Sequence, residues 1–383
     1  MLAVAVLAPA AAAHAQSGAG GAASSPPPKL TSLQCRTTCS GPAYARAGSE
    51  VRLGGSALGD VRTVTFLGAR GPGDDVAVAP VSASGRRVIV KVPRKARSGA
   101  VAVTNGDGVM SRPSASKLRI EKVATRRATS GPGPAIDVAL SGRKVFFDGE
   151  RRPTLTYVLR DDAPVHALVQ VVRLADGAVV AEFDQGDVPP DEQRIVSWDG
   201  RVAGATAPDG RYAFTVVAHG RHGATATTAQ AAPRSDAPPP ESFVLLGHKF
   251  PVRGKHDYGG YSATFGGGRG HQGQDVFARC GTPLVAARGG TVKMKKFQAR
   301  AGHYVVIDTA GSGIDHAYMH LRDAAVVDHG DRVRTGQLIG YVGDTGRASG
   351  CHLHFEAWSA PGWYTGGSPF DPLPDLLAWD KSS

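Results

Sequence analysis

Four histidines and one aspartate in the last third of the chain are of types that bind metal ions and transfer protons. They lie in three short segments: GHQGQDV holds His271 and Asp275, AYMHL holds His320, and CHLHFE holds His352 and His354. Each motif is a weak signal by itself, because a chain with 13 histidines contains an H-x-H by chance in about one case in three. The surrounding segments therefore decide whether the five side chains can meet.

The segment HLHFEAW is typical of a β-strand, in which successive side chains point to opposite faces. His352 and His354 then share one face, while Leu353 and Phe355 share the other face and can enter a core. The same alternation places Cys351 opposite the two imidazoles, which makes this thiol a poor candidate for a metal ligand.

Two further segments can contribute side chains to the same groove. HAYMHL predicts a second strand whose even positions, His316, Tyr318 and His320, project together. His271 and Asp275 are four residues apart, which puts them on one face if their segment is extended. Three β segments are thus expected to aim imidazoles and one carboxylate at a common point.

Nitrogen and carboxylate ligands in threes suit zinc, because catalytic zinc sites hold three protein ligands and keep a fourth position for water. Bound zinc lowers the pKa of that water from about 15.7 to about 7, so hydroxide is available at neutral pH. Two spare histidines beside such a metal suit proton transfer and stabilisation of a tetrahedral oxyanion. A structural zinc would be closed by four ligands, so the spare imidazoles predict a catalytic centre.

The composition indicates what kind of scaffold positions these residues. The 383 residues include 50 Gly and 26 Pro, while aromatic residues reach only 7%. This mixture favours many short strands joined by turns over long helical bundles. No apolar run of about 18 residues follows the N-terminal segment, which excludes a polytopic membrane protein. The four Cys are too few for a miniprotein built on disulfides.

Turn residues and composition shifts predict a mainly β chain with several domains. The apolar start ends in an A-x-A site and lacks a basic beginning, and we interpret it as a signal peptide. Helical periodicity is confined to the end of the chain. The expected order is a signal peptide at 1–15, a flexible leader at 16–30, strand-rich modules at 31–122 and 137–221, a Pro-rich linker at 223–242, and an antiparallel-sheet domain at 243–376.

The net charge of +11 is concentrated in the first module. Residues 16–136 carry 18 Lys and Arg against 6 Asp and Glu, whereas residues 137–221 carry 10 against 13 and residues 222–383 carry 16 against 14. For an exported chain this surplus favours an anionic polymer of the cell envelope over nucleic acid. A face that only increases solubility explains the charge equally well.

The two strand-rich modules resemble immunoglobulin-like β-sandwiches. The first is similar to modules of the transcription-factor-immunoglobulin type, and the second to bacterial immunoglobulin-like modules of hook-capping proteins. That second resemblance is carried by SWDGR and APDGRY, where we expect Trp198 to fill the core and Asp209-Gly210 to form a hairpin turn. Neither module contains a cluster of residues suited to catalysis or metal binding, so both are expected to be spacers or adhesive units.

The C-terminal domain resembles the lysostaphin-type (LytM-like) zinc endopeptidases of peptidoglycan, which have an antiparallel sheet of the duplicated-hybrid-motif type. The resemblance is carried by GRGHQGQDVFARCGTPLVAARGGTV, GHYVVIDTAGSGIDHAYMHL and DRVRTGQLIGYVGDTGRASGCHLHFEAW, in the order of the family. It implies zinc bound by His271, Asp275 and His354. It also implies that His320 and His352 serve as general base and transition-state stabiliser, without assigning either role to either residue. All five positions are intact, which favours an active enzyme.

Two other histidines depart from the family pattern. The family often carries Asn at the position of His303 and a small polar residue at the position of His316. We interpret both changes as harmless, although each could add a titratable group to the rim of the cleft.

The four cysteines are expected to be oxidised in an exported chain. Of the three possible pairings we favour the local one, Cys35 with Cys39 and Cys280 with Cys351. The second bridge would fix the H-x-H strand to the loop that follows Asp275. Free, buried thiols are the alternative.

The leading interpretation is a secreted zinc endopeptidase that hydrolyses stem peptides or cross-bridges of peptidoglycan by attack of metal-bound water. One alternative is a catalytically silent regulator of other wall hydrolases that only binds the wall. Another is a D-alanyl-D-alanine carboxypeptidase or dipeptidase with an H-x-H strand. Such enzymes have a longer spacing between His and Asp and a separate catalytic Glu, which this sequence does not show.

Overall fold

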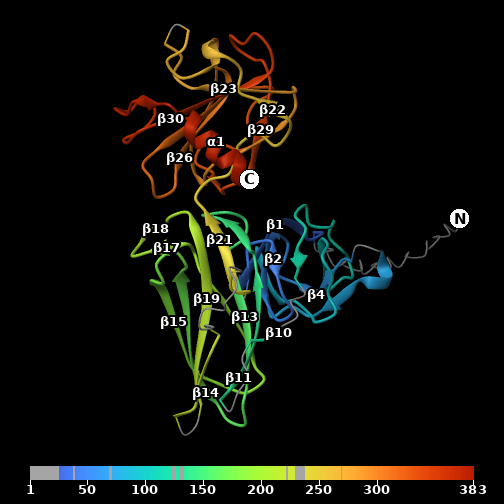
Figure 1. Ribbon diagram of the computed structural model, residues 1–383. Helices are drawn as coiled ribbons and strands as arrows, with labels where there is room; N and C mark the ends of the chain where they lie inside the picture. Colours follow the sequence, from blue (N-terminus) through green and yellow to red (C-terminus); the bar gives the residue numbers. More distant parts are fainter. Residues whose placement is uncertain are drawn as a thin grey trace, which may run out of the picture.

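The computed structural model describes residues 26–37, 39–68, 71–121, 126–128, 133–220, 223–228, 238–268 and 270–383. The predicted signal peptide and most of the predicted leader lie outside the described residues. Three β-rich modules follow one another along the chain, and Figure 1 shows the orange and red C-terminal module beyond one end of the green second module. The described part of the chain is mainly β, which confirms the predicted fold class.

The first module consists of two sheets that enclose one core. The sheets combine β1 (Lys29–Thr37), β3 (Glu50–Ser56), β7 (Arg87–Lys91) and β6 (Ser82–Ser84) on one side, and β5 (Val76–Val78), β4 (Val61–Phe66) and β8 (Val101–Asn105) on the other. A short pair joins β2 (Tyr44–Ala45) to β9 (Arg119–Ile120). Apolar residues of both sheets are buried together, such as Leu53, Phe66 and Val103. The β-sandwich follows from this shared core, while its immunoglobulin-like type stays a prediction.

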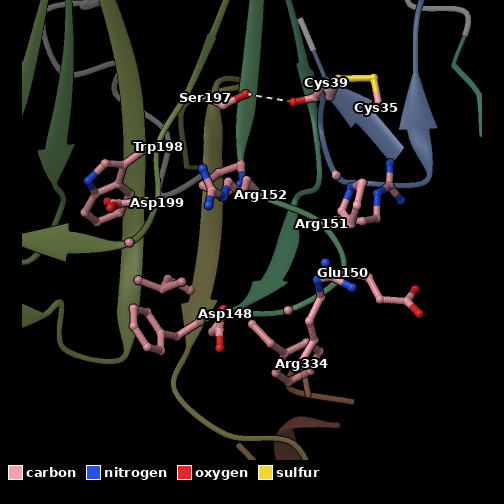
Figure 2. A pocket seen from close by; sticks show the side chains of 18 of the residues that line it. Cys35, Cys39, Asp148, Glu150, Arg151, Arg152, Ser197, Trp198, Asp199 and Arg334 are labelled. Carbon is pink, nitrogen blue, oxygen red and sulfur yellow. Dashed lines mark hydrogen bonds between the residues drawn. A yellow bond between two sulfur atoms is a disulfide. The ribbon is translucent and has the colours of Figure 1, made fainter. Parts of the chain in front are cut away.

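The second module also has two sheets around one core. One sheet contains β10 (Arg126–Arg127), β11 (Ala135–Ser141), β13 (Thr154–Arg160) and β16 (Gln193–Ser197). The other contains β12 (Lys144–Phe146), β21 (Ser242–Leu246), β19 (Gly210–His219), β14 (Val165–Arg173) and β15 (Val179–Val188), with β20 (Thr225–Thr227) beside β19. Trp198 is buried in the core between them, with its ring 5.0 Å from that of Tyr212, as predicted. Figure 2 labels Trp198 and the preceding Ser197, which is the last residue of β16.

The predicted hairpin turn at Asp209-Gly210 is wrong. Gly210 is the first residue of β19, and the Asp209 carboxylate accepts a hydrogen bond from the backbone N–H of Gly247 at 2.6 Å. The tight turn instead lies at Ala203-Gly204, between β17 (Arg201–Val202) and β18 (Ala205–Thr206). Both turn residues have positive φ, which is the conformation that a two-residue type I′ hairpin requires.

The predicted boundary between linker and C-terminal domain also needs correction. Strand β21 pairs with β19 and β12 of the second module, and its Phe243 and Leu245 are buried in that module's core. Part of the predicted linker likewise forms β20. The alternation of apolar residues in SFVLL outweighs the adjacent Pro-rich run, so the second module extends to Leu246 and the C-terminal domain begins about four residues later than predicted.

The C-terminal module is built on one antiparallel sheet. Its strands are, in spatial order, β22 (His256–Asp257), β23 (Gln274–Ala278), β30 (His352–Trp358), β27 (Asp315–Leu321), β26 (Gly302–Thr309), β25 (Gly290–Gln298) and β28 (Arg332–Val333). β31 (Pro369–Phe370) pairs with β30, and β24 (Pro283–Val285) pairs with β29 (Leu338–Tyr341). The helix α1 (Leu373–Ser382) covers this core with Leu376 and Trp379, where helical periodicity was expected.

Both favoured disulfides are present. Cys35 is bonded to Cys39, and Cys280 is bonded to Cys351, so the loop after β23 is fixed to the residue that precedes β30. Among the described residues no helix is long and apolar enough to cross a membrane.

Candidate metal centre

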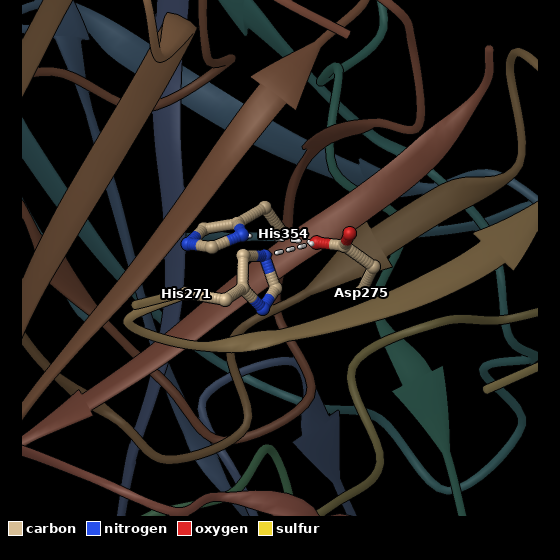
Figure 3. A group of neighbouring side chains, drawn as sticks. All are labelled: His271, Asp275 and His354. Atoms are coloured by element: carbon tan, nitrogen blue, oxygen red, sulfur yellow. Dashed lines mark hydrogen bonds and ion pairs between the residues drawn. The ribbon is translucent and has the colours of Figure 1, made fainter. Parts of the chain in front are cut away.

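The three predicted ligands converge at one point, beside the neighbouring strands β23 and β30 of the C-terminal sheet (Figure 3). β23 pairs with β30 in a register that places Asp275 opposite His354. Oδ1 of Asp275 lies 2.9 Å from Nδ1 of His354 and 3.1 Å from Nε2 of His271. One ligand atom from each of the three residues lies within 4.8 Å of the others. The predicted meeting of two imidazoles and one carboxylate is therefore present.

His271 reaches this point from a loop. It precedes β23, so the expected sharing of one strand face by His271 and Asp275 is wrong, because only Asp275 is part of the strand. Nδ1 of His271 lies 3.1 Å from the carbonyl oxygen of Thr264 and donates to it. The carbonyl holds the Nδ1 proton, so Nε2, which faces Asp275, is the nitrogen that would bind a metal ion.

His354 is held from behind by a buried carboxylate that the sequence analysis did not single out. Nε2 of His354 donates to Oε1 of Glu356 at 3.0 Å. The other oxygen, Oε2, accepts from Nε1 of Trp358 at 2.7 Å and from Nε1 of Trp363 at 3.0 Å. Glu356 is 4% exposed, so its orientation is set by these three donors. Carboxylates in this position orient metal-binding imidazoles in many proteins.

The electrostatics of the cluster favour a positive charge. Burial alone would raise the pKa of Asp275, but hydrogen bonds from His271 and His354 outweigh it and hold that pKa well below its usual range. Burial alone would lower the pKa of His354, but the hydrogen bonds to Asp275 and Glu356 raise it to about 9. Two carboxylates thus hold a cation at His354. The donor set and the anchored imidazoles fit a zinc ion bound by His271, Asp275 and His354.

Removing the charge of Glu356 is expected to weaken zinc binding. Glu356→Gln keeps the shape of the side chain but loses the anionic acceptor for His354, so zinc affinity should fall by about 10- to 100-fold. Competition with a chromophoric chelator measures this affinity. Asp323→Asn, which changes an exposed carboxylate in the same domain, is the matched control. Equal zinc affinity in the Glu356 variant and the control would contradict this orienting role.

His320 and His352 lie beside the three ligand residues. The ring of His320 is 4.8 Å from that of His352 and 6.0 Å from that of His354, measured between centroids. Nδ1 of His320 donates to the Thr345 carbonyl at 2.8 Å, and Nδ1 of His352 donates to the Gly350 carbonyl at 2.8 Å. Nε2 of His352 lies 3.6 Å from Oδ1 of Asp275. Because each Nδ1 proton is held by a carbonyl, Nε2 is in both imidazoles the nitrogen that can act as a base or, once protonated, as an acid.

The expected projection of His316, Tyr318 and His320 on one face is wrong. His316 and Tyr318 are buried on the core side, with their rings about 5 Å from that of Phe355. The pairing of β26 and β27 shifts register after Tyr318, and His320 has a φ of 60°. This β-bulge turns His320 to the face of His352, and bulges commonly re-aim side chains in this way.

The two histidines that depart from the family pattern do not join the cluster. Burial and the neighbouring His248 and Arg288 lower the pKa of His316, so it is a neutral core residue. His303 packs edge-on against Phe297, with 4.9 Å between ring centroids. The interpretation of His316 as part of a cleft rim is thereby excluded.

Burial also determines the charge state of His320. It lowers the pKa of His320 to about 4, because desolvation outweighs the hydrogen bond to the Thr345 carbonyl. The imidazole is therefore neutral at pH 7, which is the state that accepts a proton.

Comparison with known proteins supports the assignment of this domain. Residues 269–372 match the family described as "Peptidase family M23". The Peptidoglycan DD-endopeptidase ShyC of Vibrio cholerae serotype O1 is 42% identical over 86 residues, which are 22% of this chain and 19% of that protein. The L-Ala--D-Glu endopeptidase of Bacillus subtilis is 32% identical over 150 residues, covering 35% of this chain and 44% of its own length. The Glycyl-glycine endopeptidase ALE-1 of Staphylococcus capitis is 33% identical and covers 32% of this chain and 33% of its own length.

A solved structure matches the same region. The catalytic domain of lysostaphin from Staphylococcus simulans is 30% identical, with a TM-score of 0.28, and the match covers 33% of this chain and 92% of that domain. The chain thus spans less than half of the length of each of the three curated relatives described above.

Proposed function

We propose that this chain, whose residues 269–372 form a peptidase family M23 domain, is an exported zinc endopeptidase that hydrolyses peptide bonds of peptidoglycan. The observation that carries the proposal is the convergence of His271, Asp275 and His354 beside two imidazoles that are each anchored through Nδ1 to a backbone carbonyl. A metal site with no further chemistry would not need His320 and His352 in this arrangement.

Zinc, when bound, supplies a Lewis acid that polarises the scissile carbonyl and lowers the pKa of a water molecule. The chain's own residues perform the proton transfers. His320, neutral at pH 7 and anchored by the Thr345 carbonyl, accepts the proton of the attacking water. His352 is anchored by the Gly350 carbonyl on the same face and, when its Nε2 is protonated, donates a hydrogen bond from that atom to the oxygen that becomes negative. The proton that His320 accepted then passes to the leaving amine.

The substrate class rests on the similar proteins. Their names specify a peptidoglycan DD-endopeptidase, an L-Ala--D-Glu endopeptidase and a glycyl-glycine endopeptidase, which are three different bonds. The proposal for this chain is therefore the class, namely stem peptides or cross-bridges of peptidoglycan. Such a substrate lies outside the cytoplasm, which agrees with the predicted signal peptide and with two disulfides.

Hydrolysis of isolated peptidoglycan tests the proposal. The purified chain is expected to contain about one zinc per molecule, and to release peptides with new amino termini that mass spectrometry identifies. A chelator should abolish release, and added zinc should restore it. Binding to peptidoglycan with one zinc bound but no bond cleaved would replace the proposal with the silent regulator. Release of only terminal D-alanine would indicate a carboxypeptidase.

A further inference from the structure

A polar cleft of about 630 Å³ lies where the three modules meet, away from the metal centre (Figure 2). Its walls come from the Cys35–Cys39 loop of the first module, the segments 146–153 and 195–201 of the second, and Arg332 and Arg334 of the C-terminal module. The C-terminal part belongs to the edge of the sheet at β28, on the far side from β23. A ligand in this cleft would therefore leave the metal centre open.

Arginines dominate the lining. Six of them face three acidic residues, so the cleft has a formal charge of +3; the arginines are Arg36, Arg151, Arg152, Arg201, Arg332 and Arg334, and the acids are Asp148, Glu150 and Asp199. A surplus of this size in a confined cleft attracts anions, because the walls focus the field.

Three of the arginines already have partners within the protein. Arg332 pairs with Asp148 at 2.7 Å, Arg151 pairs with Glu121, and Arg201 donates to the carbonyl of Gly204 at 2.9 Å. These contacts help to hold the walls of the cleft in place.

The other three arginines have no ion pair within the described part of the chain. Arg36 comes from the first module, Arg152 from the second and Arg334 from the C-terminal module. Arg36 and Arg152 are exposed and Arg334 is half-buried, so their guanidinium groups are available to a ligand from solvent. Each module thus contributes one available guanidinium.

We propose that this cleft binds an anionic polymer with repeated phosphate groups. A guanidinium fork pairs with phosphate through two parallel hydrogen bonds. Phosphate oxygens point in several directions and can pair with forks from different modules, whereas the two oxygens of a carboxylate lie in one plane. Most of the basic residues in 16–136 lie outside the cleft lining, and this wider surplus favours a ligand whose charges repeat along a chain. The site goes beyond the proposed peptidase function and would anchor the enzyme on a wall that carries such a polymer.

Binding of fluorescently labelled polyphosphate to the full chain, followed by anisotropy, tests the proposal. In the triple variant Arg36→Gln/Arg152→Gln/Arg334→Gln the dissociation constant should rise by at least about tenfold, because three charge-assisted contacts are lost. Binding should also weaken with added salt. The zinc content and near-UV circular dichroism of the variant should equal those of the unmodified chain, because Arg36 and Arg152 belong to other modules and Arg334 follows β28, on the other side of the sheet from β23. Unchanged affinity in a correctly folded variant would overturn the site.

A second triple variant separates the cleft from the general charge of the first module. Arg86→Gln/Arg94→Gln/Arg112→Gln removes the same charge from exposed positions outside the cleft and should change affinity by less than about twofold. Equal losses of polyphosphate affinity in both triple variants would show that binding depends on the overall positive charge and not on the cleft. Polyglutamate binding as tightly as polyphosphate would overturn the choice of phosphate, and a preference for duplex DNA would overturn the class of polymer. None of these outcomes bears on the peptidase activity.

Discussion

Alanine at His271, Asp275 or His354 is expected to remove bound zinc and to reduce peptidoglycan hydrolysis to background. Catalytic zinc sites have only three protein ligands, so losing one leaves two, which seldom retain the ion. Zinc affinity should fall by more than about 100-fold, which exceeds the effect of losing an outer partner such as Glu356. Elemental analysis of the purified variants and peptide release from isolated peptidoglycan measure the two quantities.

Two controls separate loss of the metal from loss of the fold. His329→Ala removes an exposed histidine of the same domain and should change neither zinc content nor hydrolysis. Asp275→Asn keeps the shape of the side chain at the centre of the cluster, so it should fold normally and still lose zinc, because the anionic ligand is gone. One full equivalent of zinc in all three alanine variants would refute the ligand assignment.

Strand alternation predicted the part of the site that lies in regular strands. It placed His352 with His354 and buried Leu353 and Phe355, and the structure has both arrangements. The same rule, applied two residues further, points to Glu356, which shares the face of His354 and binds its Nε2. The signal for this residue was therefore present in the sequence.

The predictions made from strand alternation were wrong where the backbone departs from a regular strand. His320 follows a β-bulge and has positive φ, and no local pattern in HAYMHL reveals the extra residue. His271 is placed by a loop whose shape depends on a carbonyl seven residues earlier, at Thr264. Both positions required tertiary information, and only the family resemblance assigned them.

The prediction of the domain boundary was wrong for a different reason. The Pro-rich run before residue 242 is a strong linker signal, but the partners of β21 lie on β12 and β19, far away in sequence. A strand that completes a sheet in this way is fixed by long-range pairing, which composition does not encode. The Cys280–Cys351 bridge was easier to predict, because the two residues flank segments already expected to bring their side chains to a common point.

Replacing His320 or His352 is expected to abolish most of the activity while the zinc stays bound. Neither imidazole belongs to the group of converging ligand atoms, and each is anchored through Nδ1 to a backbone carbonyl instead. Loss of a general acid or base costs about 10²- to 10⁴-fold in rate, so hydrolysis should fall by this factor in each variant. Zinc content should remain near that of the unmodified chain.

The substitution at His320 must remove the imidazole without straining the backbone. Its φ of 60° lies in the left-handed region, which Asn adopts more readily than Ala does. His320→Asn therefore removes the imidazole without adding backbone strain, which otherwise costs about 1–3 kcal/mol. At His352, in a regular strand, Ala suffices. If His320→Asn and His352→Ala lose as much zinc as the ligand variants do, the division of the five residues into ligands and proton carriers is wrong. If they keep zinc and full activity, the chemistry is performed by other groups.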